Sequence, residues 1–347
     1  MNSAKEMEER ISRLHADRLI DLHFDLPLSL FWNRARKNIV ATDFHSEFEE
    51  GDIGLLGVAT YVEDKHLGDA LRVALDQIAL VYAEVEINSR LMLCQSFADI
   101  ERARTEGRIG LMLTMEGAEP LGDDPHLLRV FYELGVRAIS LTHARPNAAA
   151  AGGIFSASGS PATGLTSFGR ELVRECERLG ILIDLAHINP VGFDEICAAT
   201  FKPLIVSHSN ARKFYDIERN ISDEQIKKIG ARGGVIGVNA ILVGPTKEEA
   251  TLDRYVDHIE HIVDLIGIDG IGIGFDFCEF LFNQMPKAEL KEMQSKLTTP
   301  HFLSDLTNHS HARNLTRRLI ERGFDEAQIE KILRGNWLRV LRQVLSK

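Results

Sequence analysis

The sequence predicts a (β/α)8 barrel of the TIM type that spans residues 1–347 as a single domain. Three observations favour this fold. Eight short apolar, β-rich runs recur along the chain, and segments with helical periodicity separate them. The runs lack a clean alternation of polar and apolar residues, as expected of parallel strands covered on both faces. Hydrophobic residues make up 44% of the chain, and no linker, low-complexity tract or repeat divides it.

The eight predicted strands leave room for at least one helix after each of them. In chain order they are residues 19–25, 53–62, 109–117, 136–144, 181–187, 203–209, 233–240 and 270–277.

Three of the intervening segments carry clear helix signals. Residues 165–180 place their apolar side chains on one stripe and end in glycine, a common helix stop. Residues 222–233 open with Ser222, and Gln225 follows three positions later, which is the pattern of a capping box. Residues 251–267 repeat the apolar periodicity and also end in glycine.

Other segments fall outside the regular repeat. Residues 63–108 are long enough for more than one crossover helix. We expect residues 1–18 to form an N-terminal helical extension, residues 281–310 to form an irregular excursion after the last strand, and the last fifty residues to hold the closing helices.

Ionisable side chains lie at the carboxyl ends of six of the eight predicted strands, which is where barrel active sites form. In the first strand, Asp21, His23 and Asp25 occupy alternate positions and therefore share one face. The seventh strand offers only Asn239 at this end. The side chains that we expect to converge are His23, Asp25, Glu116, His143, His187, His208 and Asp276.

These residue types indicate a metal centre. Histidine, aspartate and glutamate without cysteine are ligands for zinc or a similar divalent ion at a catalytic site. Five ligands exceed the need of one ion, whereas two ions about 3.5–4 Å apart would use them all. Glu116 is the natural bridge, with His23 and Asp25 completing one site and His187 and His208 the other. Such a pair would lower the pKa of a water held between the ions and make it a nucleophile.

Composition narrows the partners and the compartment. The net charge of −11 should repel nucleic acid and anionic membranes, so we expect neither as a partner. The N-terminus lacks the apolar segment of a signal peptide, and no apolar run approaches the length of a membrane span. The four cysteines form no CxxC pair, which suits a reducing, cytoplasmic location.

The same residues resemble the motifs of the membrane dipeptidase (renal dipeptidase) family of binuclear zinc peptidases, whose barrel is of the metallo-dependent hydrolase type. The similarity runs from about residue 19 to the C-terminus, apart from the excursion. It is carried by "DLHFDLP", "TMEG", "LTHA", "LGILIDLAH", "PLIVSHSNA", "ERNISDE" and "GIGFDF".

The resemblance implies a dipeptidase that holds two zinc ions and accepts free dipeptides, including those with a C-terminal D-residue. It implies that His143 faces the substrate and donates to the oxyanion. Arg219 would grip the substrate carboxylate, and Asp276 would shuttle a proton or anchor the substrate amine. The implied metal ligands are His23, Asp25, Glu116, His187 and His208.

Three positions depart from the family pattern and leave alternatives open. Phe275 precedes Asp276, and Cys278 and Glu279 replace an aspartate and a glycine. These changes motivate a second hypothesis, an amidohydrolase acting on another small amide or a lactone at the same binuclear site. A third hypothesis, a non-catalytic binding barrel, would be supported by missing ligands, and none is missing. The physiological substrate, the native metal and the formation of a homodimer stay open.

Two aspartates in the strands, Asp21 and Asp184, allow two interpretations. Asp21 and Asp184 either orient a neighbouring ligand histidine, as carboxylates behind a metal site do, or make ordinary buried hydrogen bonds. His309 and His311 are expected to be loop residues.

Overall fold

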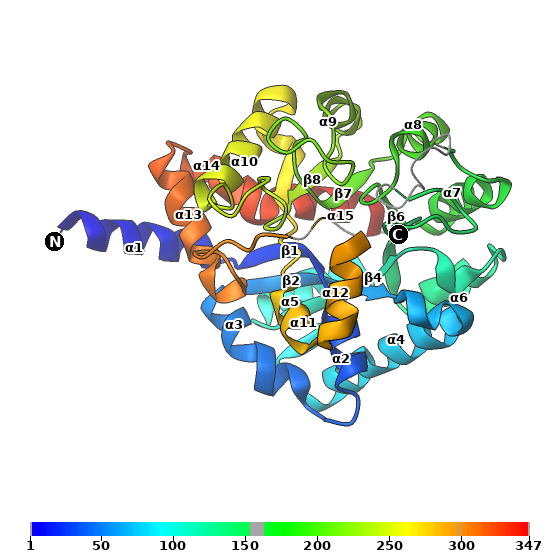
Figure 1. Cartoon of the computed structure of the whole chain (residues 1–347). Helices are drawn as coiled ribbons and strands as arrows, with labels where there is room; N and C mark the ends of the chain where they lie inside the picture. The colour runs from blue at the N-terminus through cyan, green and yellow to red at the C-terminus, as the bar shows by residue number, and fades with distance from the viewer. Residues whose placement is uncertain (1, 153–162, 297, 299, 346–347) are drawn as a thin grey trace.

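The computed structural model describes residues 2–152, 163–296, 298 and 300–345. Within these residues, eight parallel strands close into a barrel that helices surround (Figure 1), which confirms the predicted fold class. The neighbours run in the order β2-β1-β9-β8-β7-β6-β5-β4, and a pairing between β2 and β4 closes the ring. The barrel strands are β1 (Leu19–Phe24), β2 (Ile53–Tyr61), β4 (Ile109–Glu116), β5 (Val136–Ser140), β6 (Leu182–Asp184), β7 (Ile205–Ser209), β8 (Val235–Val238) and β9 (Ile271–Ile273).

A further short strand, β3 (Leu91–Leu93), was not predicted. It pairs with the start of β4, whereas β5 pairs with the later part of β4, from Leu113 onward. Three residues are too few to show a period against the helical segments on either side.

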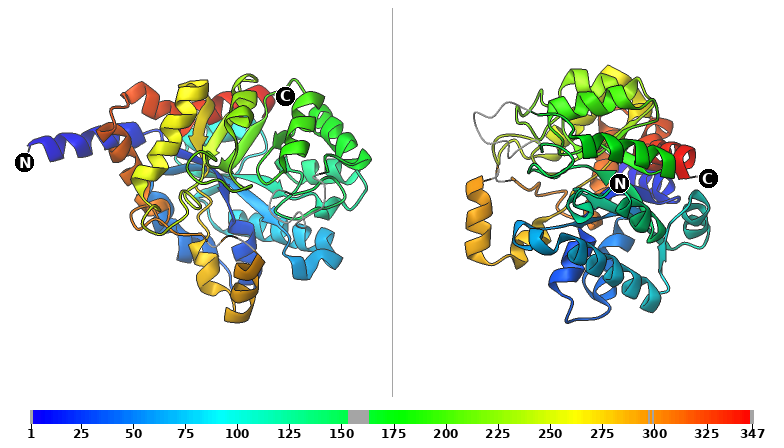
Figure 2. Two further views of the ribbon diagram at one scale, coloured as in Figure 1. Left: turned by 45° about the horizontal axis from the view of Figure 1, so that its top comes forward. Right: turned by 90° about the vertical axis from the view of Figure 1, so that its right-hand side faces the viewer.

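The helices cover the outside of the barrel (Figures 1 and 2). Their bounds are α1 (Asn2–His15), α2 (Leu26–Trp32), α3 (His45–Glu50), α4 (Ala70–Ile87), α5 (Phe97–Thr105), α6 (Leu127–Glu133), α7 (Ser167–Leu179), α8 (Pro190–Ala199), α9 (Asp223–Gly230), α10 (Leu252–Ile266), α11 (Glu279–Gln284), α12 (Lys287–Lys296), α13 (Ala312–Glu321), α14 (Glu326–Glu330) and α15 (Asn336–Leu345).

The sequence signals at the helix ends act as predicted. The hydroxyl of Thr166 accepts from a backbone N–H of α7, and Gly180 ends that helix with a left-handed φ of 77°, which costs glycine little. The capping box of α9 is complete, because Ser222 and Gln225 each accept from the other's backbone N–H.

Helix α15 closes the end of the barrel opposite the predicted site. Trp337 is fully buried there, and its Nε1 donates to the carbonyl of Ile273 at 2.9 Å. It packs in one hydrophobic cluster with residues from the first halves of the strands, among them Ile20, Met112 and Val235. The amino end of the barrel is therefore filled, and the carboxyl end is left for a site.

The N-terminal segment and the segment after the last strand both contain helices. Residues 2–15 form α1, which extends away from the barrel (Figure 1). Part of the segment 281–310, expected to be irregular, is helical in α11 and α12, and "KAELKEMQSK" is rich in good helix formers. Among the described residues, no helix is both long and apolar enough to cross a membrane.

Candidate metal centre

The seven side chains predicted to converge lie together at the carboxyl end of the barrel. The Oε1 atom of Glu116 is 3.0 Å from Nε2 of His187, 3.4 Å from Nε2 of His208 and 3.8 Å from Nε2 of His23. Asp25 reaches the same place, with Oδ1 3.9 Å from Nε2 of His23. One oxygen of a single carboxylate thus faces histidines from three different strands.

Three overlapping groups of potential ligand atoms occupy this region, each within a span of 4.8 Å. One combines His23, Asp25 and Glu116, as predicted for the first ion. The other two bring in residues that were not predicted as ligands. They are Glu116 with His143 and His187, and His23 with His208 and Asp276.

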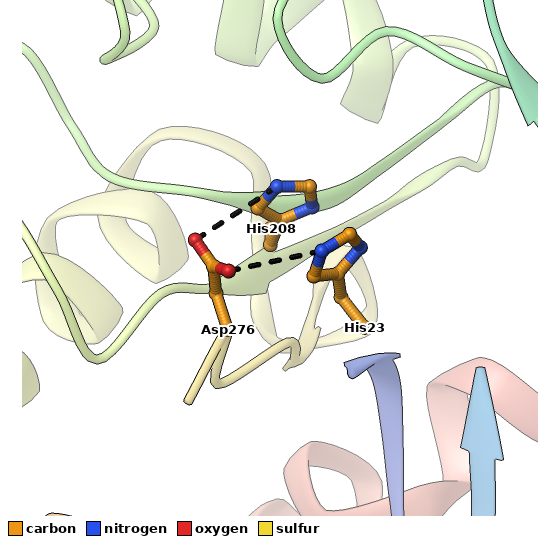
Figure 3. A group of neighbouring side chains, drawn as sticks. All are labelled: His23, His208 and Asp276. Atoms are coloured by element: carbon orange, nitrogen blue, oxygen red, sulfur yellow. Dashed lines mark ion pairs between the residues drawn. The ribbon is translucent and has the colours of Figure 1, made fainter. Parts of the chain in front are cut away.

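The carboxylate of Asp276 faces two stacked imidazoles, those of His23 and His208, from one side (Figure 3). Its Oδ1 is 3.7 Å from Nε2 of His23, and its Oδ2 is 3.9 Å from Nε2 of His208 and accepts from Asn239 at 2.9 Å. Asp276 has a φ of 57°, a conformation that is costly for a non-glycine residue. Gly274 lies two residues before Asp276, and a Cβ there would collide with the carbonyl of Ser207, so only glycine lets this segment approach the end of β7.

A hydroxyl group behind the site positions one of the candidate ligand histidines. The hydroxyl of Ser207 shares a 2.7 Å hydrogen bond with Nδ1 of His208, which leaves Nε2 directed at the carboxylates. Asp184 instead accepts from the backbone N–H groups of Ala186 and Ser207, so of its two alternatives the ordinary buried hydrogen bond is found. His187 has a φ of 64°, a second left-handed residue at the site.

Burial shifts the protonation of every member of the cluster in the direction that avoids charge. It raises the pKa of Asp25 to about 7 and raises the pKa of Glu116 well above its usual value, with Asp25 and Asp276 adding repulsion. Burial, together with the nearby positive charge of Arg219, lowers the pKa of His23 to about 3.

The residues present fit divalent metal ions. Nε2 of His187 and Nε2 of His208 are 2.9 Å apart, although a neutral imidazole has only one N–H and burial disfavours the charged form. Oε1 of Glu116 lies close to both of these nitrogens, and Oδ1 of Asp25 faces Nε2 of His23. A cation placed among neutral imidazoles and carboxylates would satisfy groups that otherwise repel one another.

A cavity of about 1000 Å³ opens over this cluster, and Arg219 and His143 line it. Arg219 is 5% exposed; its Nη2 donates to the carbonyl of His208 at 2.8 Å, while its Nη1 has no partner among the described residues. The ring of His143 lies 4.2 Å from that of His187 and 4.6 Å from that of Tyr61. Both residues therefore face the space beside the candidate metal ligands.

The sequence did not single out several residues of this cavity. Tyr61 ends β2 and lies opposite Glu116 in the parallel register. Its position at the carboxyl end of a strand could have identified it from the sequence, but tyrosine is not a usual zinc ligand. Glu63 follows β2, Lys65 lies in the short 3-10 helix Asp64–Asp69 after it, and Glu289 comes from α12.

Comparisons with known proteins agree with one another. The sequence profile described as "Membrane dipeptidase (Peptidase family M19)" matches residues 8–346. The Klebsiella pneumoniae "uncharacterized protein in pqqA 5′ region" is 31% identical over 285 residues, which cover 80% of this chain and 98% of that protein. Dipeptidase 3 of Mus musculus is 30% identical over 352 residues, which cover 97% of this chain and 66% of that protein.

Solved structures show the same likeness. The structure of "dipeptidase AC", a metallopeptidase, is 26% identical with a TM-score of 0.82, covering 95% of this chain and 99% of its own. A metallopeptidase from Rhodobacter sphaeroides, solved with a phosphinate mimic of the dipeptide L-Ala-D-Ala, is 26% identical with a TM-score of 0.81, covering 94% and 99%.

Proposed function

Because the chain belongs to the membrane dipeptidase family, peptidase family M19, and is a metallopeptidase, we propose that it hydrolyses free dipeptides with two divalent metal ions. The observation that carries this proposal is the cavity that joins the ligand cluster to Arg219. A buried guanidinium with an unpartnered Nη1 needs an anionic ligand, and the C-terminal carboxylate of a short peptide supplies one.

We assign His23 and Asp25 to one ion, His187 and His208 to the other, and Glu116 to both. The short distances from Oε1 of Glu116 to the imidazoles of both sets support this bridge. Zinc is the ion that this nitrogen and oxygen donor set favours at a catalytic site. When bound, such a pair of ions lowers the pKa of water and polarises a carbonyl group.

The chain's own residues would bind and orient the substrate around that chemistry. Arg219 would take the C-terminal carboxylate through its free Nη1. His143, beside His187, would donate a hydrogen bond to the carbonyl oxygen as negative charge develops on it. Asp276 would accept a proton at Oδ1, because Asn239 already occupies Oδ2, and would pass it to the leaving amine or hold the substrate ammonium.

A C-terminal D-residue should be accepted. The Rhodobacter metallopeptidase was solved with a mimic of L-Ala-D-Ala, and its structure aligns with 94% of this chain.

The location in a reducing cytoplasm, which the dispersed cysteines indicate, stays a prediction. All four cysteines are buried and form no disulfide.

One observation keeps the broader amidohydrolase hypothesis as a second candidate. Cys278, which departs from the family pattern, lines the cavity next to Asp276. Turnover of L-Ala-L-Ala and L-Ala-D-Ala should be compared with that of lactones and N-acyl amino acids, before and after removal of the metal with a chelator. Metal-dependent cleavage of the dipeptides supports the first proposal; cleavage of the other substrates alone would replace it by the second.

A further inference from the structure

The cavity is larger than a dipeptide of two small residues requires. Its volume of about 1000 Å³ stands at the upper end of the range for drug-sized ligands. Two small residues clamped between Arg219 and Asp276 would leave much of this space to a side chain. The residues that line the remaining space therefore indicate which class of substrate side chain it accommodates.

One wall of the cavity is apolar. Leu28 of α2 and Cys278 and Leu281 near α11 form a buried hydrophobic cluster, with Ile241 and Phe282 packed against it. Figure 1 shows α11 and α12 on the same side of the barrel as α2. Methylene groups of a long side chain would lose unfavourable contact with water against this wall.

The outer lining is strongly acidic. Apart from Arg219, Lys65 is the only lysine or arginine among the described residues that line the cavity. Some of the acids are already paired, such as Asp64 with Arg145 at 2.8 Å, but Glu218 has no ion pair with any described residue. The carboxylates outside the metal cluster are Glu63, Asp64, Asp216, Glu218, Glu289 and Glu292.

The chain itself shows that this lining accommodates an ammonium group. Nζ of Lys65 lies 3.0 Å from Oε2 of Glu289 and 3.2 Å from Oε1 of Glu63. The other oxygen of Glu63 accepts from Nε1 of Trp32 at 2.9 Å, and the Lys65 ammonium is 6.0 Å from the centre of that ring. Arg145 pairs with Asp64, and Nε of Arg212 lies 3.6 Å from Oδ1 of Asp216, so the charge that Lys65 leaves without an ion pair among the described residues is that of Glu218.

Nη1 of Arg219, in the same cavity, has no partner in the described part of the chain, which independently indicates a ligand with an anionic end. Building on the dipeptidase function proposed above, we infer that the preferred dipeptides also carry a cationic side chain, of the lysine, ornithine or arginine class. Its methylene stem packs on the apolar wall, and its charged end lies among the outer carboxylates. The same field disfavours dipeptides with acidic side chains.

The test compares side chains of equal shape and different charge. Dipeptides of alanine with lysine, norleucine or glutamate, in both orders, are assayed for kcat/KM at low and high salt. The better lysine dipeptide should exceed its norleucine counterpart by about tenfold, the factor that about 1.4 kcal/mol supplies. Glutamate should fall below norleucine, and the advantage of lysine should shrink at high salt.

Charge variants then locate the effect. Glu218→Gln and Glu289→Gln should reduce the lysine-to-norleucine ratio, and Lys65→Gln should raise it, because it removes the competing ammonium. Glu171→Gln, on α7 and outside the cavity lining, is the matched control and should leave the ratio unchanged. Equal hydrolysis of lysine and norleucine dipeptides, or an equal response to Glu171→Gln, would overturn the inference alone. Failure to cleave any dipeptide would overturn the proposed function and this inference with it.

Discussion

Nε2 of His309 lies 2.8 Å from Oδ2 of Asp21, and both side chains are completely buried although 288 residues separate them. The other oxygen of Asp21 accepts from the backbone N–H of His23 at 3.2 Å and of Phe275 at 3.0 Å. Asp21 thus fastens β1, which carries His23, to the segment after β9, which carries Asp276. Its hydrogen bonds hold the backbone behind the site.

This pairing makes the stability of the protein depend on His309. His309→Ala should lower the free energy of unfolding by about 3 kcal/mol, because it leaves a buried carboxylate without its partner. Denaturation by urea measures the change. His311→Ala is the matched control, because His311 lies in the same short helix but is only partly buried, and it should have a much smaller effect. Equal losses in the two variants would contradict the pairing.

The bridging role of Glu116 predicts a specific pattern of metal loss. Glu116→Ala should lose metal from both sites, since Oε1 faces histidines of both proposed sets. His187→Ala should empty mainly one site. Metal analysis of the purified variants, with the unaltered protein as reference, gives the number of ions per chain. Two ions retained in Glu116→Ala would rule out the bridge.

A substitution at Asp276 shows whether this side chain transfers a proton or binds a metal ion. Its oxygens lie 3.7 and 3.9 Å from two imidazoles, so the geometry alone allows either role. If Asp276 moves a proton, Asp276→Asn should keep the full metal content and lose kcat by roughly 10²–10⁴-fold, the usual contribution of a general acid or base. Metal content and kcat are measured on the same preparation. Loss of metal would make Asp276 a ligand, and near-normal turnover would remove it from proton transfer.

The clustering of side chains at the strand ends was predictable, because a parallel barrel brings the carboxyl end of every strand to one face. The position of a residue along its strand is then enough to place it at the site. This is why His23, Glu116 and His208 could be placed together from the sequence. The Asp21–His309 pair was not predictable, because nothing in the local sequence shows which buried carboxylate a distant histidine will meet. The outer cavity was missed for a related reason: Lys65 and Glu289 lie outside the repeating strands, and only the packing of α12 brings them together.

The last prediction concerns the length of the substrate. Arg219 offers a permanently charged, planar donor group to a free carboxylate, and Asp276 lies on the metal side of the same cavity. In a C-amidated dipeptide or a tripeptide, a neutral amide would face Nη1 of Arg219, and leaving that charge unpaired commonly costs a few kcal/mol. An N-acetylated dipeptide should fail at Asp276 for the same reason.

The assay is kcat/KM for an L,D-dipeptide, its N-acetyl and C-amide forms, and the matching tripeptide. Arg219→Ala should weaken hydrolysis of the free acid and narrow its advantage over the amide, because the variant no longer distinguishes a carboxylate from an amide. Circular dichroism and metal content serve as controls, because Nη2 of Arg219 also donates to the carbonyl of His208 and the substitution removes that hydrogen bond. If blocked or longer peptides are cleaved as well as the free dipeptide, two-ended recognition is wrong, and the broader amidohydrolase hypothesis gains support.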